Sequence, residues 1–424
     1  MIPIIEYSKQ SKNRLFLKRK VFENDALEKA VSEILRNIKQ NGDKAVQKYS
    51  ATFDGYNSST FLVTTAEFIE AEKQISKTLK QAIQNAYNNI YKFHLSQQNN
   101  ESPVLVHPGV KCWRKSVPIQ KVGFYIPGGT APLFSTVLML AIPAGIAGCV
   151  EKIMCTPCNS AGEINPAILY TAKLCGIEKI FKVGGAQAIA AMAYGTETIP
   201  RVYKIFGPGN QYVTCAKQLV QKEGVAIDIP AGPSEVAILA DQSANPAFVA
   251  ADMLSQTEHG IDSQAVLVTN SKSMTESVQQ ELEKQLALLP RKDIASKALQ
   301  NSCMVLVTDL TEGIELLNEY APEHLILSVA DTPQYADKVI NAGSVFLGNY
   351  SPESAGDYAS GTNHTLPTNA FAKAYSGVSL DSFIKKITFQ EITLQGLRQL
   401  SVSITEMAEA EGLHAHANAV KIRL

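Results

Sequence analysis

Short apolar runs alternate with helix-length stretches along most of this chain, and that alternation sets narrow limits on its fold. Strands that alternate with helices pair in parallel through crossover connections, so we expect an α/β fold. The predicted strands form two series, 122–126, 152–156, 179–183, 203–206 and 225–229, then 264–269, 303–307, 325–328 and 344–347. The two series predict two doubly wound, incomplete Rossmann-like lobes with a ligand cleft between them.

Both ends of the chain depart from this pattern. Residues before about 115 show helical spacing, and Thr64 with Glu67 forms a capping box ahead of one long helix or two abutting ones. Near the C-terminus a helical stretch precedes Val420, Ile422 and Leu424 in alternation, which predicts a strand seeking a sheet edge, here or on another subunit. We therefore expect an N-terminal helical region and a small C-terminal helix–strand tail.

The expected division of the chain follows from these zones. Residues 1–25 form an N-terminal arm, and residues 121–235 form a nucleotide-binding α/β lobe. Residues 26–120 together with 236–380 form a larger α/β lobe with a helical extension. Residues 381–424 form the tail, which we expect to pack on a partner subunit.

The charge balance excludes several classes of partner. With 39 Lys and Arg against 40 Asp and Glu, the formal charge is −1, which gives no broad electrostatic case for nucleic acid or an anionic membrane. Residues 122–150 lack charged side chains, but Pro127, Pro132 and Pro143 interrupt the continuous apolar helix that spanning a membrane requires. The seven cysteines are odd in number, and no cleavable apolar leader precedes them, which favours a reduced, cytoplasmic protein.

Four glycine-containing turns fall where predicted strands end, at 125–129, 184–187, 207–210 and 231–235. Ligands of open parallel sheets bind at the carboxyl ends of the strands, where glycine lets backbone N–H groups approach a phosphate. One such turn is more often a tight corner, but four at the same end of a sheet indicate the edge of a site. None is a G-x-G-x-x-G fingerprint with a matched acidic residue about 20 positions on, so an orthodox Rossmann dinucleotide site is not supported.

Two polar residues stand out on the helix expected from Pro246. Gln256 shares the apolar stripe of that helix with Val249 and Met253, and His259 lies three residues further along the same side. Polar atoms on a core-facing stripe need partners. The pair is therefore a candidate for a functional site, and an equal alternative is a histidine that meets the last-turn carbonyls while Gln256 bonds to backbone.

Glu323 and His324 stand at the mouth of a predicted buried strand, where imidazole and a partly buried carboxyl group suit acid–base chemistry. As neighbours on an extended chain they should point to opposite faces and serve different steps. The alternative is a surface glutamate beside a structural histidine. Asp357 belongs to the segment 351–364, which we interpret as an ordered functional loop, with Asp357 as a metal ligand or a turn-capping residue.

Seven segments of the chain, in order, resemble the histidinol dehydrogenase family. They are GFYIPGGTAPLFS at 123–135, GGAQ at 184–187, FGPGN at 206–210, PAGPSE at 230–235, SQTEHG at 255–260, PEH at 322–324 and SPESAGDYASGTNH at 351–364. The resemblance covers nearly the whole chain, and several segments are long. It implies a zinc-containing, intertwined homodimer that oxidises L-histidinol through histidinaldehyde to L-histidine with two NAD molecules.

Position within these motifs gives each candidate residue an implied role. The zinc ligands would be Gln256, His259, Asp357 and His416, with His416 supplied by the other subunit. The catalytic residues would be His324, which takes the alcohol proton, and Glu323, which activates water for the aldehyde step. The NAD contacts would be Tyr125, Gln187 and Asn210. The substrate contacts would be Ser234, Gln256, His259, His324, Asp357, Glu411 and His416. His414 lies beside His416, and the sequence leaves open which of the two faces the metal.

Two other functions remain open. A cysteine-dependent aldehyde dehydrogenase would use Cys149 or Cys215 as its nucleophile. A non-catalytic α/β nucleotide-binding protein would carry these histidines as structural residues. The C-x-x-C formed by Cys155 and Cys158 lacks the second pair of a structural zinc site, so we expect it neither to bind metal nor to do redox work.

Overall fold

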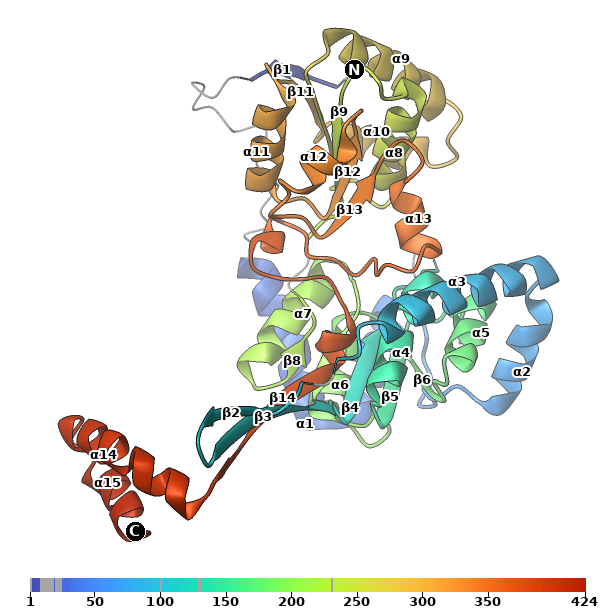
Figure 1. The fold of residues 1–424 in the computed structure, drawn as a ribbon. Coiled ribbons are helices and arrows are strands. Elements are labelled where there is room, and N and C mark those ends of the chain that lie inside the picture. The colour runs from blue at the N-terminus through green and yellow to red at the C-terminus, as the bar shows by residue number, and fades with distance from the viewer. Residues whose placement is uncertain (1, 8–18, 20–24, 100, 129–131, 230–231) are drawn as a thin grey trace.

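A computed structural model describes residues 2–7, 19, 25–99, 101–128, 132–229 and 232–424. They form two parallel sheets covered by helices, one above the other in Figure 1, and a tail that projects from the lower part. The predicted α/β class is confirmed. The predicted turns at 125–129 and 231–235 each lie partly outside the described residues.

The lower sheet in Figure 1 has five parallel strands in the order β6–β5–β4–β7–β8. The strands are β4 (Lys121–Tyr125), β5 (Glu151–Thr156), β6 (Lys179–Lys182), β7 (Lys204–Phe206) and β8 (Ala226–Ile227). The helices between them are α4 (Phe134–Ala147), α5 (Pro166–Leu174), α6 (Gly185–Tyr194) and α7 (Gln211–Lys222). The first predicted series is therefore a parallel sheet whose strands are connected through helices. The uncharged segment is β4 and the buried helix α4, and no described helix is both long and apolar enough to cross a membrane.

Three helices that precede this sheet pack against the helices that cover it. They are α1 (Asp25–Phe53), α2 (Thr65–Gln74) and α3 (Lys77–Leu95). The capping box of Thr64 and Glu67 is confirmed at the start of α2, and α2 and α3 are two helices rather than one. Val31 and Leu35 of α1 share a core with Ala190 of α6. The expected division grouped residues 26–120 with the larger lobe, whereas these helices cover the five-stranded sheet, because helical periodicity reveals an apolar face but not which sheet it covers.

The upper sheet has six parallel strands in the order β1–β11–β10–β9–β12–β13. The strands are β1 (Ile4–Glu6), β9 (Glu235–Ala240), β10 (Gln264–Thr269), β11 (Cys303–Leu306), β12 (His324–Ser328) and β13 (Ser344–Leu347). The helices are α8 (Pro246–Thr257), α9 (Lys272–Leu286), α10 (Lys292–Leu299), α11 (Leu310–Tyr320), α12 (Thr332–Ala336) and α13 (Glu353–Tyr358). The sequence reading missed β9, an inner strand, because a short apolar run without alternation fits helix and strand equally.

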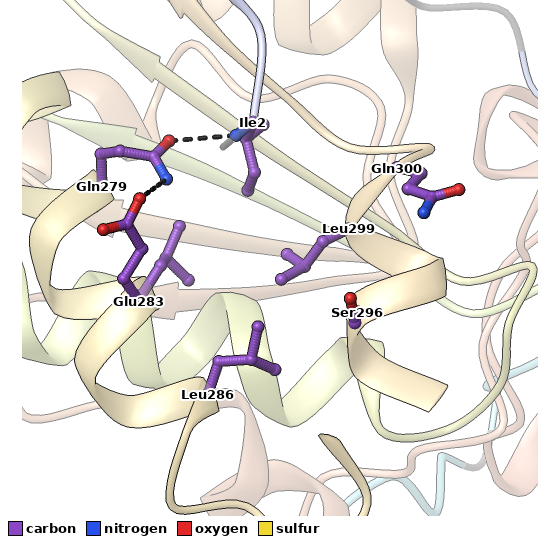
Figure 2. A pocket seen from close by; sticks show the side chains of 8 residues that line it. Ile2, Gln279, Glu283, Leu286, Ser296, Leu299 and Gln300 are labelled. Atoms are coloured by element: carbon purple, nitrogen blue, oxygen red, sulfur yellow. Dashed lines mark hydrogen bonds between the residues drawn. The ribbon is translucent and has the colours of Figure 1, made fainter. Parts of the chain in front are cut away.

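A cavity of about 270 Å³ lies where the N-terminus meets α9 and α10, and Figure 2 shows its lining. The backbone N–H of Ile2 donates to Gln279 Oε1 at 3.1 Å, and Gln279 in turn donates to Glu283. Leu282, Leu286 and Leu299 supply the apolar wall. Because Ile2, Gln279 and Glu283 bond to one another and leucines form much of the rest of the lining, we interpret the cavity as a packing gap.

A small antiparallel sheet in the order β14–β3–β2 leads into the tail. Its strands are β2 (Val104–His107), β3 (Val110–Pro118) and β14 (Ile384–Ile392), and Trp113 stacks on Phe389 with ring centroids 5.4 Å apart. The sequence reading did not predict this sheet. Its long pair of strands extends away from the five-stranded sheet and carries the tail outward (Figure 1).

The tail itself consists of two helices, α14 (Leu394–Ala410) and α15 (His414–Lys421). The predicted C-terminal strand is therefore wrong. Val420 lies in α15 and is buried with Ala417, three residues before it, on one helical face. Three apolar residues at alternate positions are too few to distinguish a strand from the end of an amphipathic helix.

Candidate active site

The three predicted NAD contacts lie at one edge of the five-stranded sheet, where its strands end. Tyr125 ends β4, and its buried hydroxyl accepts from the Gly185 N–H at 3.1 Å. Gln187, in the first turn of α6, donates through Nε2 to Asp54 Oδ2 at 3.2 Å. Asn210 caps α7 with its side-chain oxygen. Asp54, directly after the end of α1, thus lies beside the turn that begins α6. No acidic residue matched to that turn stood out in the sequence near it. Binding of NAD by these residues stays a prediction.

The turn before Asn210 is fixed by a buried ion pair. The Gly207 N–H donates to Asp228 Oδ2 at 2.7 Å, and Lys217 Nζ donates to the Gly207 carbonyl oxygen at 2.8 Å, while Lys217 and Asp228 pair with each other. Gly207 has a φ of +125°, and a Cβ there would collide with the carbonyl oxygen of Tyr125. Glycine at this position is therefore a steric requirement of the turn.

Glu323 and His324 lie together, contrary to the expectation that they point to opposite faces. Glu323 Oε2 is 3.7 Å from His324 Nδ1, and both side chains are almost fully buried. The reason is local: His324 is the first residue of β12, and Glu323 occupies the bend before it, where strict alternation does not apply. The Glu323 carboxylate also accepts from the Glu235 N–H at 2.9 Å.

Burial and neighbouring charges together set the pKa values of this pair. It raises the pKa of Glu323 to about 8. Burial alone would lower the pKa of His324, but the carboxylates of Glu323 and Asp357 raise it to about 10. A buried carboxyl group with a pKa near neutrality, beside an imidazole, is the combination that general acid–base chemistry uses.

Next to this pair, the side chains of His259, Glu353 and Asp357 each offer an atom within 4.8 Å of the others, a spacing that could hold a metal ion. His259 follows the C-terminal end of α8, and the other two lie on α13. The His259 ring is 41% exposed, whereas Glu353 is almost fully buried. Its partial burial lowers the pKa of His259, which favours the neutral imidazole that binds metals. Glu353 did not stand out in the sequence, although it lies in the predicted functional loop.

Gln256 is fully buried on α8 beside this cluster, as its place on the apolar stripe predicts. One orientation of its amide satisfies every neighbour: the NH₂ group donates to both Glu353 oxygens, at 2.6 and 2.9 Å, and the oxygen accepts from the Glu235 N–H at 3.0 Å. Gln256 is therefore joined to the cluster through Glu353. The sequence also allowed that Gln256 bonds to backbone. That is correct for its amide oxygen, whereas its amide nitrogen donates to a side chain.

Glu235 contacts the site through its backbone and Arg19 through its side chain. Its backbone N–H serves Glu323 and Gln256, and its carboxylate receives Arg19 at 2.5 and 2.7 Å in a forked ion pair. The Arg19 guanidinium also lies 3.9 Å from the centre of the Tyr320 ring. Arg19 thus anchors the first residue of β9 through an ion pair. Ser234, the adjacent predicted substrate contact, lies directly before that strand.

His364 bridges the two parts of the molecule without joining the cluster. Its Nδ1 lies 2.8 Å from the Asp357 carbonyl oxygen, and its Nε2 lies 3.0 Å from Thr136 Oγ1 of α4. Both ring nitrogens are therefore engaged. This histidine positions the backbone of Asp357, and we do not count it among candidate ligands.

The remaining predicted residues lie elsewhere in the chain. His416 is on α15 and Glu411 ends α14, and both are exposed, as is His414. Figure 1 shows α14 and α15 in the projecting tail, far from α13. A single chain thus brings together Gln256, His259 and Asp357, but not His416.

The four cysteines singled out in the sequence lie in surroundings that disfavour the thiolate. Burial raises the pKa of Cys149 to about 11, and it raises the pKa of Cys215 as well. Cys155 and Cys158 are not bonded to each other; burial raises the pKa of Cys158 to about 11. Because the thiolate is the reactive form, these sites argue against cysteine catalysis.

Two parallel sheets covered by helices, a buried Glu–His pair and an adjoining group of side chains that could hold a metal ion are the features of an α/β enzyme. The chain shares its fold, at 14% identity and a TM-score of 0.50, with an acetylating aldehyde dehydrogenase from Geobacillus thermoglucosidasius, over 86% of this chain and 96% of that one.

Closer relatives identify the family. The histidinol dehydrogenase family model matches residues 17–424. A histidinol dehydrogenase from Bacteroides thetaiotaomicron is 58% identical over 100% of this chain and 99% of its own length. The crystal structure of histidinol dehydrogenase from Elizabethkingia anophelis is 53% identical, with a TM-score of 0.97 over 100% of this chain and 98% of that one. The chain belongs to the histidinol dehydrogenase family, which are oxidoreductases of histidine biosynthesis.

Proposed function

We propose that this chain oxidises L-histidinol to L-histidine through histidinaldehyde, with two NAD molecules per substrate and a zinc ion in a site shared between two subunits. The observation that carries the proposal is the contact between two groups of residues: the metal-binding side chains of His259 and Asp357, and the buried pair of Glu323 and His324. Family membership supports the same reaction.

The residues present fit a cation. Asp357 Oδ1 and His324 Nε2 are buried 3.4 Å apart, and neither has a well-formed hydrogen bond within the described part of the chain. Burial raises the pKa of Glu353 to about 8, and repulsion from Asp357 and Glu323 adds to the effect. A divalent cation would relieve this crowding of carboxylates. Gln256, His259 and Asp357 would hold the zinc, with His416 of the partner subunit. When bound, zinc acts as a Lewis acid that anchors and orients nitrogen ligands.

The acid–base pair then has two separable tasks. His324 would accept the alcohol proton as the carbinol is oxidised, and Glu323 would remove a proton from the water that adds to the aldehyde. Both tasks need the unprotonated form, and a cation held by Asp357 would favour it by lowering the raised pKa of each group. Ser234 and Glu411 would contact the substrate. Tyr125, Gln187 and Asn210 would hold NAD, which supplies the hydride acceptor for each oxidation.

A homodimer would complete the site. The tail projects from the body, and large apolar side chains on it and on β2 are more than half exposed, namely Val104, Leu105, Val106, Val402 and Met407. Exposed apolar surface of this extent is typical of a protein interface. Packing of the tail on a partner would bury that surface and carry Glu411 and His416 to the partner's metal-binding residues.

Compartment and domain division belong to the same proposal. All seven cysteines are unpaired, which suits a reducing, cytoplasmic setting. Residues 121–235 would act as the nucleotide-binding lobe, and residues 236–380 would carry the metal and acid–base residues.

The test is the absorbance of NADH formed from L-histidinol by the purified enzyme, before and after chelation. We expect two NADH per histidinol, loss of turnover on chelation and its return with zinc. A thiol reagent that abolished turnover in a substrate-protected way, with no effect of chelation, would favour the cysteine-dependent alternative. Absence of NADH with zinc and histidinol supplied would favour a non-catalytic nucleotide-binding protein.

A further inference from the structure

Two helices in different parts of the molecule each present a backbone carbonyl that their own helix cannot pair. Figure 1 shows α4 in the lower part and α13 in the upper part. The Met139 carbonyl of α4 has no donor one turn on, because the residue there is Pro143, which has no N–H. The Asp357 carbonyl lies in the last turn of α13, where carbonyls also lack helical donors. A buried carbonyl without a donor is costly, so each needs a partner from elsewhere.

Two consecutive residues, Asn363 and His364, supply both donors. Asn363 Nδ2 donates to the Met139 carbonyl oxygen at 2.7 Å, and His364 Nδ1 lies 2.8 Å from the Asp357 carbonyl oxygen. Because a carbonyl oxygen only accepts, His364 Nδ1 carries the hydrogen of that bond. His364 Nε2 is left for the hydroxyl of Thr136, 3.0 Å away in the first turn of α4. The two residues thus contact α4 at two places about one turn apart, and α13 at one.

Asn363 is held against α4 by further contacts at both ends of its amide. Its Oδ1 accepts from the Thr365 N–H at 2.9 Å, and its Nδ2 also lies 3.4 Å from His94 Nε2. His94 is fully buried on α3, and its other ring nitrogen lies 3.1 Å from Gln97 Oε1. Asn363 therefore has one fixed orientation, which also fixes the backbone that leads into His364.

These contacts join the two sites that hydride transfer must bring together. Asp357 is a proposed zinc ligand, and α4 follows β4, whose last residue is the proposed NAD contact Tyr125. Zinc would hold the substrate on one lobe while NAD lies on the other, so the spacing of the lobes sets the distance between the reacting atoms. That distance must be about 3–3.5 Å, and a displacement of about 1 Å can slow a reaction about 10²-fold.

We propose that Asn363 and His364 are positioning residues that form a clasp between the two lobes, and that this clasp sets the approach of the nicotinamide to the substrate carbon. The role rests on the proposed function. It predicts that loss of the clasp slows hydride transfer without loosening either ligand from its own lobe.

Kinetics of two clasp variants test this role on the purified full-length protein with zinc, NAD and L-histidinol. Thr136→Val keeps the shape of the side chain but removes the hydroxyl, and His364→Asn keeps a donor near the Nδ1 position but no longer reaches Thr136. We expect each to lower kcat about 10- to 100-fold and to leave both KM values within about threefold. Deuterium at the carbinol carbon should slow the variants more than the wild type, because hydride transfer becomes the slow step. The double variant should be no slower than His364→Asn alone, because both changes remove the same contact.

Thr171→Val is the matched control. Thr171 is a fully buried residue of α5 in the same lobe, and its hydroxyl has no hydrogen-bond partner among the described residues. Its replacement removes a buried hydroxyl without breaking a contact, so kcat should stay within about twofold of the wild type.

Two measurements do not depend on turnover. The zinc affinity of Thr136→Val, from chelator competition, should stay within about twofold of the wild type, because Asp357 keeps its contact with His364. Hydrogen exchange in Thr136→Val should become faster in residues 134–140 and 353–358 together, on the two sides of the clasp, and should not change in Thr171→Val.

Other outcomes count against the clasp. Unchanged kcat in both variants, or faster exchange in α4 alone, would mean that these residues only stabilise their own surroundings. A zinc affinity that falls in parallel with kcat would mean that they maintain the metal site and do not align the lobes. If His364→Asn does not fold, judged by circular dichroism, Thr136→Val gives the same kinetic test. A wild-type protein that forms no NADH would remove the proposed function, whereas an active wild type with unaffected variants would remove the clasp alone.

Discussion

In the proposed mechanism different side chains serve the two oxidations, and Glu323 gives the clearest prediction. Glu323→Gln keeps the shape of the side chain and its contact with the Glu235 N–H, but it removes the base that activates water. We expect oxidation of histidinaldehyde to fall by about 10²- to 10⁴-fold, the usual contribution of a positioned base, and oxidation of histidinol to fall much less. NADH formation measured separately from each substrate checks this. Equal losses with both substrates would contradict the division of labour.

The residues that sequence reasoning found differ in kind from those it missed. Gln256 and His259 were visible because polar side chains on an apolar stripe are anomalous, and Glu323 and His324 because they open a buried run. Glu353, Glu235 and Arg19 were not visible, because each lies in a locally ordinary setting and its importance comes from a contact with a remote segment. Sequence shows where a residue conflicts with its neighbours along the chain, but not which distant partner resolves the conflict.

At the scale of elements, the turn between β7 and α7 can be tested by one added methyl group. Gly207→Ala forces an L residue into a φ of +125° and against the Tyr125 carbonyl oxygen, so we expect a loss of about 3 kcal/mol in the free energy of unfolding. Gly176→Ala is the matched control, because its φ is also positive, at +69°, but no atom lies within 4 Å of the added group. It should cost about 1 kcal/mol. Urea denaturation of both variants measures the difference, and equal losses would refute the steric account.

The same scale shows where prediction of the fold succeeded and where it could not. Strands β10 and β13 begin and end at the predicted residues, because each is a short apolar run bounded by turn residues. The strands of the β14–β3–β2 sheet were missed because they lie mostly exposed, with polar and apolar residues that do not segregate to one buried face. The predicted tail strand was wrong because three apolar residues at alternate positions also fit the end of an amphipathic helix, where Val420 is buried and Ile422 is exposed.

If Glu411 and His416 belong to the site as proposed, a single chain cannot complete it, because the tail holds both residues away from the other members. A long pair of strands and two helices with exposed apolar faces stabilise little on their own. A second copy of the chain that covered these strands and helices would bury their apolar side chains and stabilise them. By two-fold symmetry each tail would then reach the other subunit's site, and every dimer would contain two shared sites.

This arrangement predicts complementation between two inactive variants. His416→Asn and Asp357→Asn should each be inactive as homodimers, since each removes a ligand from both sites. In a heterodimer of the two, purified through different tags, one site receives Asp357 from the first chain and His416 from the second and is intact, while the other site lacks both. We expect about half of the wild-type activity per dimer. If the tail acted within its own chain, each site would lack one ligand and the heterodimer would stay inactive. His414→Asn separates the two tail histidines, since it should remain active as a homodimer if His416 is the residue that crosses.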